Sequence, residues 1–297
     1  MRIRRQEDVT PAVLEVMERT TNPRLREIMV ALVSHLHAFV RDVRLTEDEF
    51  REAAAILNEM GQRSNDRHNE TVLMAGSLGV SSLVCLLNNG NGGTTETSQN
   101  LLGPFWRMNS PRVDNGGTIV RSDTPGPALF MSGRVVDTAG RPVEGAEVDI
   151  WHSSPVGLYE NQDPDQADFN LRGKFTTDAA GKFWFRSVKP AGYPIPTDGV
   201  VGRLLAAQQR HPYRPAHVHV LIFKPGFKTM ISQIYADDDA NLDSDVQFGV
   251  TETLTATFVR HDSAHPDVAD VVAPWFTLEH AFVLEAGEAR LPRPPIL

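Results

Sequence analysis

The spacing of apolar residues divides the chain into a helical first part and a β-rich second part. After Asn22-Pro23, apolar residues recur every three or four positions as far as Val43. This spacing predicts an amphipathic helix, with Asn22 as its cap and the proline at its first position. Thr10-Pro11 has the same form and predicts an earlier helix that is capped by Thr10.

Two more helices are predicted before residue 90. Thr46 and Glu49 form a capping box, and the helix that follows is expected to end at Gly61. A run of mostly apolar residues predicts a fourth helix over roughly 69–89. The glycine-rich segment 88–100 lacks the lysine and the preceding strand of a phosphate-binding loop, so we interpret it as a connection.

From about residue 128 the apolar residues alternate with polar ones, which predicts strands. Two strands are predicted within 129–153, separated by turns at 139–142 and 144–145, and one short helix is predicted at 202–210. Further strands are predicted at 182–188, 216–224, 230–235, 253–260 and 277–285. Many short strands joined by Gly- and Pro-containing turns indicate a β-sandwich. The predicted fold is therefore mainly β with an α-helical N-terminal part, and the predicted domains are 1–105 and 106–297.

Composition and charge narrow the classes of function. The chain of 297 residues is 41% hydrophobic and 23% charged, with a net charge of −9, which argues against a nucleic-acid partner. The single cysteine excludes an intramolecular disulfide framework and fits a reducing cytosol. The first residues lack the apolar segment of a signal peptide, and Ser and Gly interrupt the longest apolar run, 72–87. We therefore expect a cytoplasmic protein without a membrane span.

The paired histidines in RPAHVHV are the first candidates for chemistry. Alternate side chains of a strand point to the same face, so His217 and His219 are expected to stand side by side. A lone histidine on an apolar strand is usually a core residue, but a same-face pair must satisfy four ring nitrogens and favours a metal. A cupin motif would need Glu at Ile222 or Phe223, and a metallo-β-lactamase motif would need Asp at Leu221, so neither applies.

Two tyrosines are candidates to complete such a site. Tyr159 and Tyr193 both lie after a glycine, in turn-rich segments that follow a predicted strand. A tyrosine in such a place is usually a surface or packing residue, but two phenolates and two imidazoles would form a mixed oxygen and nitrogen set. Phenolate is a hard anionic ligand that suits ferric iron, whereas zinc favours His, Cys or carboxylate.

Three segments carry a resemblance to a known family. GLYE at 157–160, KPAGYPIPTDG at 189–199 and RPAHVHV at 214–220 resemble, in order and spacing, the iron motifs of the intradiol ring-cleavage dioxygenases. The similarity covers roughly 25–285 and includes LLGPFW at 101–106. The stretch GKFWFRSVKPAGYPIPTDGVVGRLL is similar to the hydroxyquinol 1,2-dioxygenases in particular, with the catechol and chlorocatechol 1,2-dioxygenases as near relatives.

The resemblance implies a cofactor and the roles of individual residues. It implies one non-haem Fe(III) per subunit, bound by Tyr159, Tyr193, His217 and His219. Tyr193 would also act as the catalytic base, and Arg214 would stabilise charge on the substrate ring. The active-site glutamine of the family falls on Gln233.

The resemblance also implies the reaction and the substrate pocket. The expected activity is intradiol cleavage of hydroxyquinol by O₂, giving 3-hydroxy-cis,cis-muconate, which tautomerises to maleylacetate. Catechol or a substituted catechol, giving cis,cis-muconates, is the alternative, because many hydroxyquinol enzymes carry an acidic residue where this chain has Gly76. Besides Arg214, the implied pocket residues are Leu73, Gly76, Pro104, Phe105, Ile195 and Pro196.

Two segments allow other interpretations. The segment 131–151 resembles the strand pair of transthyretin-like sandwich modules, which bind or pack without catalysis, but such a module has no use for four ligands at this spacing. The acidic run 236–245 suggests calcium only superficially. An EF-hand loop that begins at Asp239 would place Ser244 and Val250 where glycine and glutamate are required, so we predict a solvated loop.

The resemblance further implies partners besides the diphenol and O₂. In the family, the N-terminal helices form a homodimer interface that can enclose a phospholipid. The apolar face of the helix predicted at 22–43 fits such an interface, although a face packed on its own domain would look identical. We expect a homodimer through these helices.

Overall fold

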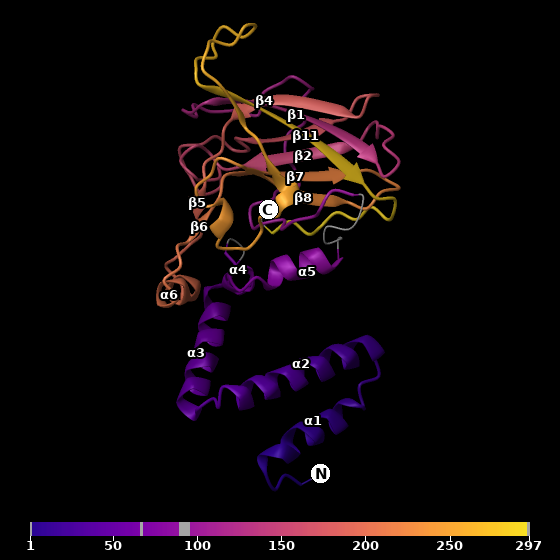
Figure 1. Cartoon of the computed structure of the whole chain (residues 1–297), viewed down its shortest axis with the longest axis vertical. Helices are drawn as coiled ribbons and strands as arrows, with labels where there is room; N and C mark the ends of the chain where they lie inside the picture. The colour runs from indigo at the N-terminus through magenta and orange to yellow at the C-terminus, as the bar shows by residue number, and fades with distance from the viewer. Residues whose placement is uncertain (1, 66–67, 89–95, 296–297) are drawn as a thin grey trace. The chain divides into compact units, whose positions relative to one another are not determined.

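The computed structural model describes residues 2–65, 68–88 and 96–295. They form two compact units, Met1–Glu59 and Met60–Leu297, and Figure 1 labels most of their helices and strands. The domain boundary predicted after residue 105 remains a prediction.

The first unit is helical, as its apolar spacing predicts. It contains the elements η1 (Gln6–Asp8), α1 (Val9–Met17), α2 (Pro23–Asp42) and most of α3 (Glu47–Arg63). Asn22 Oδ1 accepts a hydrogen bond from Leu25 N at 3.0 Å, which confirms the predicted cap of α2. The helix α3 continues slightly beyond its predicted end at Gly61.

The starts of α3 and α1 follow the predicted caps to different extents. Thr46 N donates to Glu49 Oε2 at 2.8 Å and Glu49 N donates to Thr46 Oγ1 at 3.3 Å, so the capping box is confirmed. The cap predicted at Thr10 is wrong, because α1 begins at Val9 and already contains Thr10. The Thr10 hydroxyl instead contacts His37 Nδ1 of α2 at 2.9 Å, which ties the two helices together.

Two helices replace the single helix predicted over 69–89. The helices α4 (Glu70–Ser77) and α5 (Val80–Asn88) meet at an angle of 77°. Gly79 between them has a φ of +73°, in the left-handed region where a right-handed helix ends, so the prediction of one helix is wrong. Among the described residues no single helix is long and apolar enough to cross a membrane, although α4 and α5 taken together are. Much of the predicted connection 88–100 lies outside the described residues.

The second unit contains two β-sheets of four and five strands. One has the strand order β10-β11-β1-β4 and the other β3-β2-β7-β8-β9, while β5 and β6 form a separate pair. The strands are β1 (Ala128–Asp137), β2 (Glu147–His152), β3 (Arg172–Thr176), β4 (Lys182–Val188), β5 (Tyr193–Pro194), β6 (Tyr213–Arg214), β7 (His217–Phe223), β8 (Met230–Ala236), β9 (Thr255–Ala256), β10 (Val259–His261) and β11 (Trp275–Leu284). Figure 1 shows these strands grouped together in the second unit. The predicted mainly β fold with a helical N-terminal part is confirmed.

Most predicted strands are present within two residues of their expected bounds, and the predicted short helix is α6 (Val200–Ala207). The strand predicted at 253–260 is wrong, because this stretch holds η3 (Glu252–Leu254) followed by the short β9 and β10. A further short helix, η2 (Leu242–Ser244), lies in the acidic run. The strands β3, β5 and β6 were not predicted, since strands of two to five residues show little alternation.

The strand β7 is buried on both faces. Val218, Val220 and Ile222 face the main apolar core, which also takes residues from β1, β4 and β11 of the other sheet. His217 and His219 alternate with them and therefore face the opposite side. That side is covered by a second apolar cluster, formed by Trp106, Trp151, Tyr159, Tyr193 and Leu221.

Candidate metal centre

The two histidines of β7 lie side by side, on the face away from the main core. The Nε2 atoms of His217 and His219 are 3.2 Å apart, and each residue is 1% exposed. The ring of Trp151 from β2 stacks on His219, with the ring centroids 4.7 Å apart and the planes 8° from parallel. The predicted same-face pair is therefore present, buried and held in a fixed orientation.

Two tyrosines reach this pair from neighbouring segments. Tyr159 follows β2, and Tyr193 lies in β5, where its backbone pairs with Arg214 of β6. Tyr159 OH lies 3.3 Å from Tyr193 OH, which in turn lies 3.4 Å from His217 Nε2. Gly157 allows this approach, because a Cβ at that position would lie 2.9 Å from the Tyr193 Cβ. Both phenols are buried beside the imidazoles.

The four donor atoms converge on one buried point. Their contacts of 3.2, 3.3 and 3.4 Å are longer than an ordinary hydroxyl hydrogen bond of about 2.7–2.8 Å. Donors that bind one ion at about 2.0–2.1 Å and stand roughly 100–110° apart lie about 3.1–3.4 Å from each other. The arrangement therefore fits a metal ion. Among the described residues, no cluster of three or more His, Cys, Asp or Glu side chains is placed to hold one, so the phenols are needed.

A second contact fixes the tautomer of His217. Its Nδ1 lies 2.7 Å from the Pro215 carbonyl oxygen, which can only accept, so Nδ1 carries the hydrogen and Nε2 presents a lone pair. Burial, and then the charge of Arg214, lower the pKa of His217 to about 3. Burial and the neighbouring His217 hold the pKa of His219 well below its usual value. Both imidazoles are therefore neutral at pH 7, the form that binds metals.

The phenols need a cation in order to ionise. Burial raises the pKa of Tyr159 well above its usual value, and the neighbouring Tyr193 raises it further, while the charges of Arg214 and Arg172 oppose the rise. Burial also raises the pKa of Tyr193, against the lowering effect of Arg214. Since a bound metal ion favours the anionic form of its ligands, a highly charged ion at this point would offset the burial of both phenolates.

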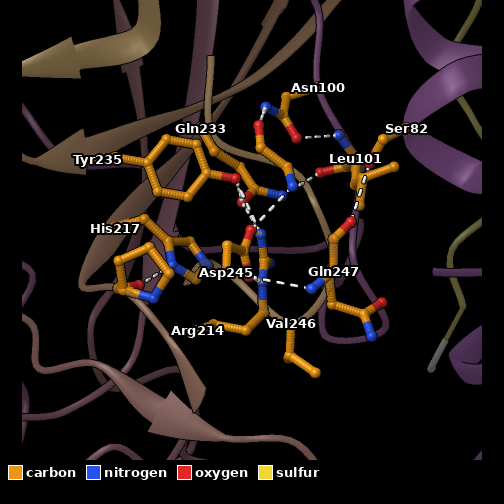
Figure 2. A network of polar contacts seen from close by, with 12 residues as sticks. Ser82, Asn100, Leu101, Arg214, His217, Gln233, Tyr235, Asp245, Val246 and Gln247 are labelled. Carbon is orange, nitrogen blue, oxygen red and sulfur yellow. Dashed lines mark hydrogen bonds and ion pairs between the residues drawn. The ribbon is translucent and has the colours of Figure 1, made fainter. Parts of the chain in front are cut away.

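Arg214 is a buried cation beside the donors, at the centre of the polar network in Figure 2. Its Nε and Nη2 atoms each donate to one carboxylate oxygen of Asp245 at 3.0 Å. Nη2 also donates to Tyr235 OH at 2.8 Å and to Gln233 Oε1 at 3.1 Å. Gln233 lies on β8 directly opposite His219, so the structure brings both predicted polar residues to the four donors.

The predicted substrate-binding residues lie in separate groups. The ring of Phe105 packs against that of Tyr159, with centroids 4.4 Å apart. Ile195 and Leu73 belong to one small apolar cluster, and Gly76 follows Leu73 by three residues on α4. The remaining two residues, Pro104 and Pro196, are exposed. Contact of any of these residues with a substrate stays a prediction.

The sequence alone did not indicate that Gln247 fills the space beside Gly76. A Cβ at position 76 would lie 1.8 Å from Gln247 Oε1. The amide is held there because its Nε2 donates to Ser77 Oγ at 2.9 Å, and the Gln247 backbone oxygen accepts from Ser82 Oγ at 2.9 Å. An amide group therefore stands where a larger residue 76 would project its side chain.

The acidic run 236–245 ends in a buried carboxylate. Asp245 is 5% exposed, so the prediction of a solvated loop is wrong for this residue. Burial raises its pKa, but the charge and hydrogen bonds of Arg214 outweigh burial and leave the pKa below its usual value. No sequence pattern links the two residues, because Arg214 lies on β6 and Asp245 lies in the loop after η2, so they meet only after folding.

Comparisons with known proteins identify the family. The family model described as Dioxygenase matches residues 101–284, and the model described as Catechol dioxygenase N terminus matches residues 22–94. The chain is 40% identical to the hydroxyquinol 1,2-dioxygenase of Rhizobium sp. (strain MTP-10005), over 94% of this chain and 95% of that protein. It is 36% identical to a catechol 1,2-dioxygenase of Candida albicans, over 89% of this chain and 88% of that protein.

Solved structures agree with this result. A hydroxyquinol 1,2-dioxygenase from Pseudomonas putida DLL-E4 matches with a TM-score of 0.87 and 36% identity, over 95% of this chain and 99% of that one. A catechol 1,2-dioxygenase from Pseudomonas arvilla C-1 matches with a TM-score of 0.83 and 29% identity, over 98% of this chain and 97% of that one. The chain belongs to the intradiol ring-cleavage dioxygenases. These enzymes are oxidoreductases that use a non-haem iron and O₂ to open the ring of an aromatic diol.

Proposed function

We propose that this enzyme is a hydroxyquinol 1,2-dioxygenase, which cleaves the C–C bond between the two adjacent hydroxylated carbons of benzene-1,2,4-triol and adds one atom of O₂ to each of these carbons. The product would be 3-hydroxy-cis,cis-muconate, in equilibrium with maleylacetate. The observation that carries the proposal is the convergence of two phenol oxygens and two imidazole nitrogens on one buried point. Relatives named for hydroxyquinol, with 35% to 40% identity, support this substrate.

One Fe(III) per subunit is the proposed cofactor, held by Tyr159, Tyr193, His217 and His219. Two anionic oxygens and two neutral nitrogens reduce the charge of a ferric ion to about +1 and suit a hard trivalent metal better than zinc. When bound, the iron would supply Lewis acidity that favours the deprotonated diol and would allow electrons to pass from the diol to O₂. The absence of thiolate from the donor set supports iron over softer metals.

Tyr193 is the proposed base for the diol. A diol that binds through both oxygens must lose two protons, and a phenolate beside it can take one of them. Burial raises the pKa of Tyr193, which favours the protonated form of its oxygen. The Tyr193 OH lies 3.3 Å from Tyr159 OH and 3.4 Å from His217 Nε2, so a proton on this oxygen stays within the site.

Arg214 is the proposed group that stabilises negative charge on the ring. It is a fixed, buried cation, and such charges act strongly where water is excluded. Gln233 supports it, because its Oε1 accepts from Arg214 Nη2 at 3.1 Å while its Nε2 donates to the Leu101 carbonyl at 2.6 Å. Gln233 therefore links the cation to the segment that carries Phe105.

Catechol is the alternative substrate, as the name of the Candida albicans relative suggests. The two diols differ by one hydroxyl group, so the choice depends on the polarity of the pocket wall. The proposed wall comprises Leu73, Gly76, Pro104, Phe105, Ile195 and Pro196. The Gln247 amide beside Gly76 adds a polar group to it and favours hydroxyquinol.

Replacing each ligand tyrosine tests the iron site. The iron-loaded protein should absorb visible light through phenolate-to-iron charge transfer, and Tyr159→Phe or Tyr193→Phe should lose much of this absorption. Tyr235→Phe is the matched control, because Tyr235 is equally buried and belongs to the neighbouring network. Iron content and visible spectra are compared at equal protein concentration. A ligand variant as coloured as the parent would show that the ligand assignment is wrong.

Relative kcat/KM values for hydroxyquinol, catechol, methylcatechols and chlorocatechols test the substrate. We expect the highest value for hydroxyquinol, with its product identified by absorption and mass spectrometry. Catechol turnover equal to or better than that of hydroxyquinol would replace the first proposal with the alternative. Either result leaves the family assignment unchanged.

A homodimer through α2, able to hold a phospholipid, is the proposed assembly. Five apolar side chains of α2 and its C-cap residue, spaced three or four residues apart, are each 47% to 53% exposed: Leu25, Ile28, Leu32, Leu36, Phe39 and Val43. A continuous apolar stripe of this kind favours a partner surface. We expect Leu32→Glu to lower the mass measured by analytical ultracentrifugation to that of one chain, and an unchanged mass argues against this interface.

The proposed location is the cytoplasm. A chain with Cys85 as its single cysteine has no internal disulfide that a reducing compartment would break. Fractionation of cells that express the full chain, followed by detection of the protein, tests this proposal. Recovery in a membrane or secreted fraction contradicts it.

A further inference from the structure

Arg214 is held in place at both its backbone and its side chain. Its backbone pairs with that of Tyr193 in the β5–β6 ladder. At the other end, the guanidinium makes two parallel bonds to Asp245, from Nε to Oδ1 and from Nη2 to Oδ2, each 3.0 Å long. Figure 2 shows this pair at the centre of the network. Both residues are at most 5% exposed, so the pair is sheltered from water.

Asp245 is itself anchored without help from Arg214. Its Oδ1 accepts from Gln247 N at 3.2 Å, and its Oδ2 accepts from Gly249 N at 2.9 Å. Each carboxylate oxygen therefore accepts from one backbone donor and one guanidinium donor. An asparagine would turn an NH₂ group toward two of these donors, so the position requires a carboxylate.

The other hydrogen bonds of the Arg214 guanidinium also involve Nη2, on the edge that faces Asp245. Nη2 contacts Tyr235 OH and Gln233 Oε1 as well as Asp245, while Nη1 takes part in none of these bonds. Arg214 lies beside the candidate metal centre, because its backbone pairs with that of Tyr193 and its Nη2 bonds Gln233, which lies opposite His219. The network therefore fixes one edge of the cation and leaves Nη1 on the other.

We propose that Asp245 is a positioning residue, which holds Arg214 so that Nη1 remains oriented for the bound diol while its own charge compensates the buried guanidinium. This inference rests on the proposed role of Arg214 toward the substrate. An oriented donor stabilises charge that develops in the transition state more than it stabilises the bound substrate. Loss of Asp245 therefore lowers kcat more than it raises KM.

Asp245→Asn in the iron-loaded full chain tests this proposal. We expect kcat to fall by about 100-fold, the scale reported for displacing a catalytic group by about 1 Å. The Kd of catechol, measured without O₂ so that no turnover occurs, should change by less than about threefold. Iron content and colour should remain, because none of the four donors is altered. Asp243→Asn, an exposed acidic residue of the same run, is the matched control and should match the parent.

A double-mutant cycle separates positioning from general damage to the fold. In an Arg214→Met background, Asp245→Asn should change kcat by less than about threefold, because no guanidinium remains to be positioned. An equal loss of kcat from Asp245→Asn in both backgrounds overturns the inference. If Arg214→Met alone leaves kcat intact, the proposed role of Arg214 fails instead, so the two failures are distinguishable.

Asp245→Glu covers the case in which the asparagine variant does not fold. It keeps the charge but moves the carboxylate by one methylene group, so it tests position apart from charge. We expect it to fold, as shown by a single thermal unfolding transition, and to lose kcat by about tenfold or more. A folded Asp245→Glu enzyme with the kcat of the parent overturns the inference.

Discussion

The side chain of Gln247 lies directly against the Cα of Gly76, and this contact shows how little freedom a single residue has near the site. The Gln247 amide cannot simply turn away, since Nε2 is bonded to Ser77 Oγ at 2.9 Å and the residue is 8% exposed. Position 76 therefore depends on a residue far away in the sequence. A change at either residue requires a compensating change at the other.

Gly76→Ala should destabilise the protein by about 1–2 kcal/mol, because overpacking a buried contact costs more than the helix propensity of alanine returns. The new Cβ would lie 1.8 Å from Gln247 Oε1. Urea unfolding measures the change. Gly61→Ala in α3 is the matched control, since nothing lies within 4 Å of its Cβ position, and it should stabilise by about 0.5–1 kcal/mol. Adding Gln247→Ala to Gly76→Ala should recover much of the loss, and no recovery would contradict the clash.

At the scale of elements, the sequence predicted the helices and strands whose apolar residues recur at regular spacing. The strand β7 is apolar along most of its length, and α2 has an apolar residue at every third or fourth position, so each leaves a pattern in the sequence. The strands β5 and β6 have two residues each and leave none, yet their pairing joins Tyr193 to Arg214. Short elements that position the site were therefore invisible before the structure.

The sequence predicted the part of the candidate site whose residues lie in short motifs. The motifs contain the four donors, Arg214 and Gln233, and the structure brings the donors within 3.4 Å of a neighbour, although their roles remain predictions. Asp245 and Gln247 were missed because their contacts join residues 31 and 170 positions apart. Only the packing of a loop against a strand, for Asp245, and against the helix α4, for Gln247, creates such contacts, and no local pattern encodes this packing.

Apolar spacing predicted one helix where the structure has α4 and α5, and the backbone angle of Gly79 explains the break between them. Gly79→Ala should destabilise the protein by about 1 kcal/mol, because a residue with a Cβ is strained at a φ of +73°. Space is not the cause, since the Cβ would meet Phe248 at an ordinary 3.5 Å. Gly79→Asn is the control and should cost less, because asparagine tolerates this region. Equal unfolding free energies for the Ala variant and the parent would show that the angle does not enforce the break.

At the scale of the whole second unit, buried cations accompany both candidate phenolates. The guanidinium carbon of Arg172 lies 5.9 Å from the Tyr159 ring centroid, and Arg172 pairs with buried Glu160 at 2.7 Å. Arg214 stands beside Tyr193 and pairs with Asp245. Burying each pair costs several kcal/mol per ion in lost hydration, which apolar residues would avoid. The positive charges near both tyrosines therefore lower the stability of the fold relative to apolar residues in the same places.

Buried titratable groups also set how the stability of this unit depends on pH. His152 donates and accepts within the protein, through Ser153 O at 2.8 Å and Ser187 Oγ at 2.7 Å. Burial lowers its pKa to about 4, so the folded protein binds its proton only at lower pH than the unfolded chain does. Asp149 has the opposite effect, since burial raises its pKa to about 7 and the folded protein gains stability as that carboxyl is protonated. The total pH profile therefore combines opposing contributions.

Comparison of His152→Gln with the parent isolates the contribution of His152 to the pH dependence of stability. As pH falls below about 6.5, unfolded His152 takes up a proton that the folded residue refuses until about pH 4, so the parent loses up to about 3 kcal/mol from this group across that window. The variant lacks this contribution, and its unfolding free energy should fall less steeply with decreasing pH. Urea unfolding at intervals from pH 7.5 to pH 4 measures both slopes, which should coincide above about pH 7 because the histidine is neutral in both states there. Parallel curves throughout the window would mean that His152 is protonated in the folded protein as readily as in the unfolded chain, and that its burial between Ser153 and Ser187 has no effect on its charge.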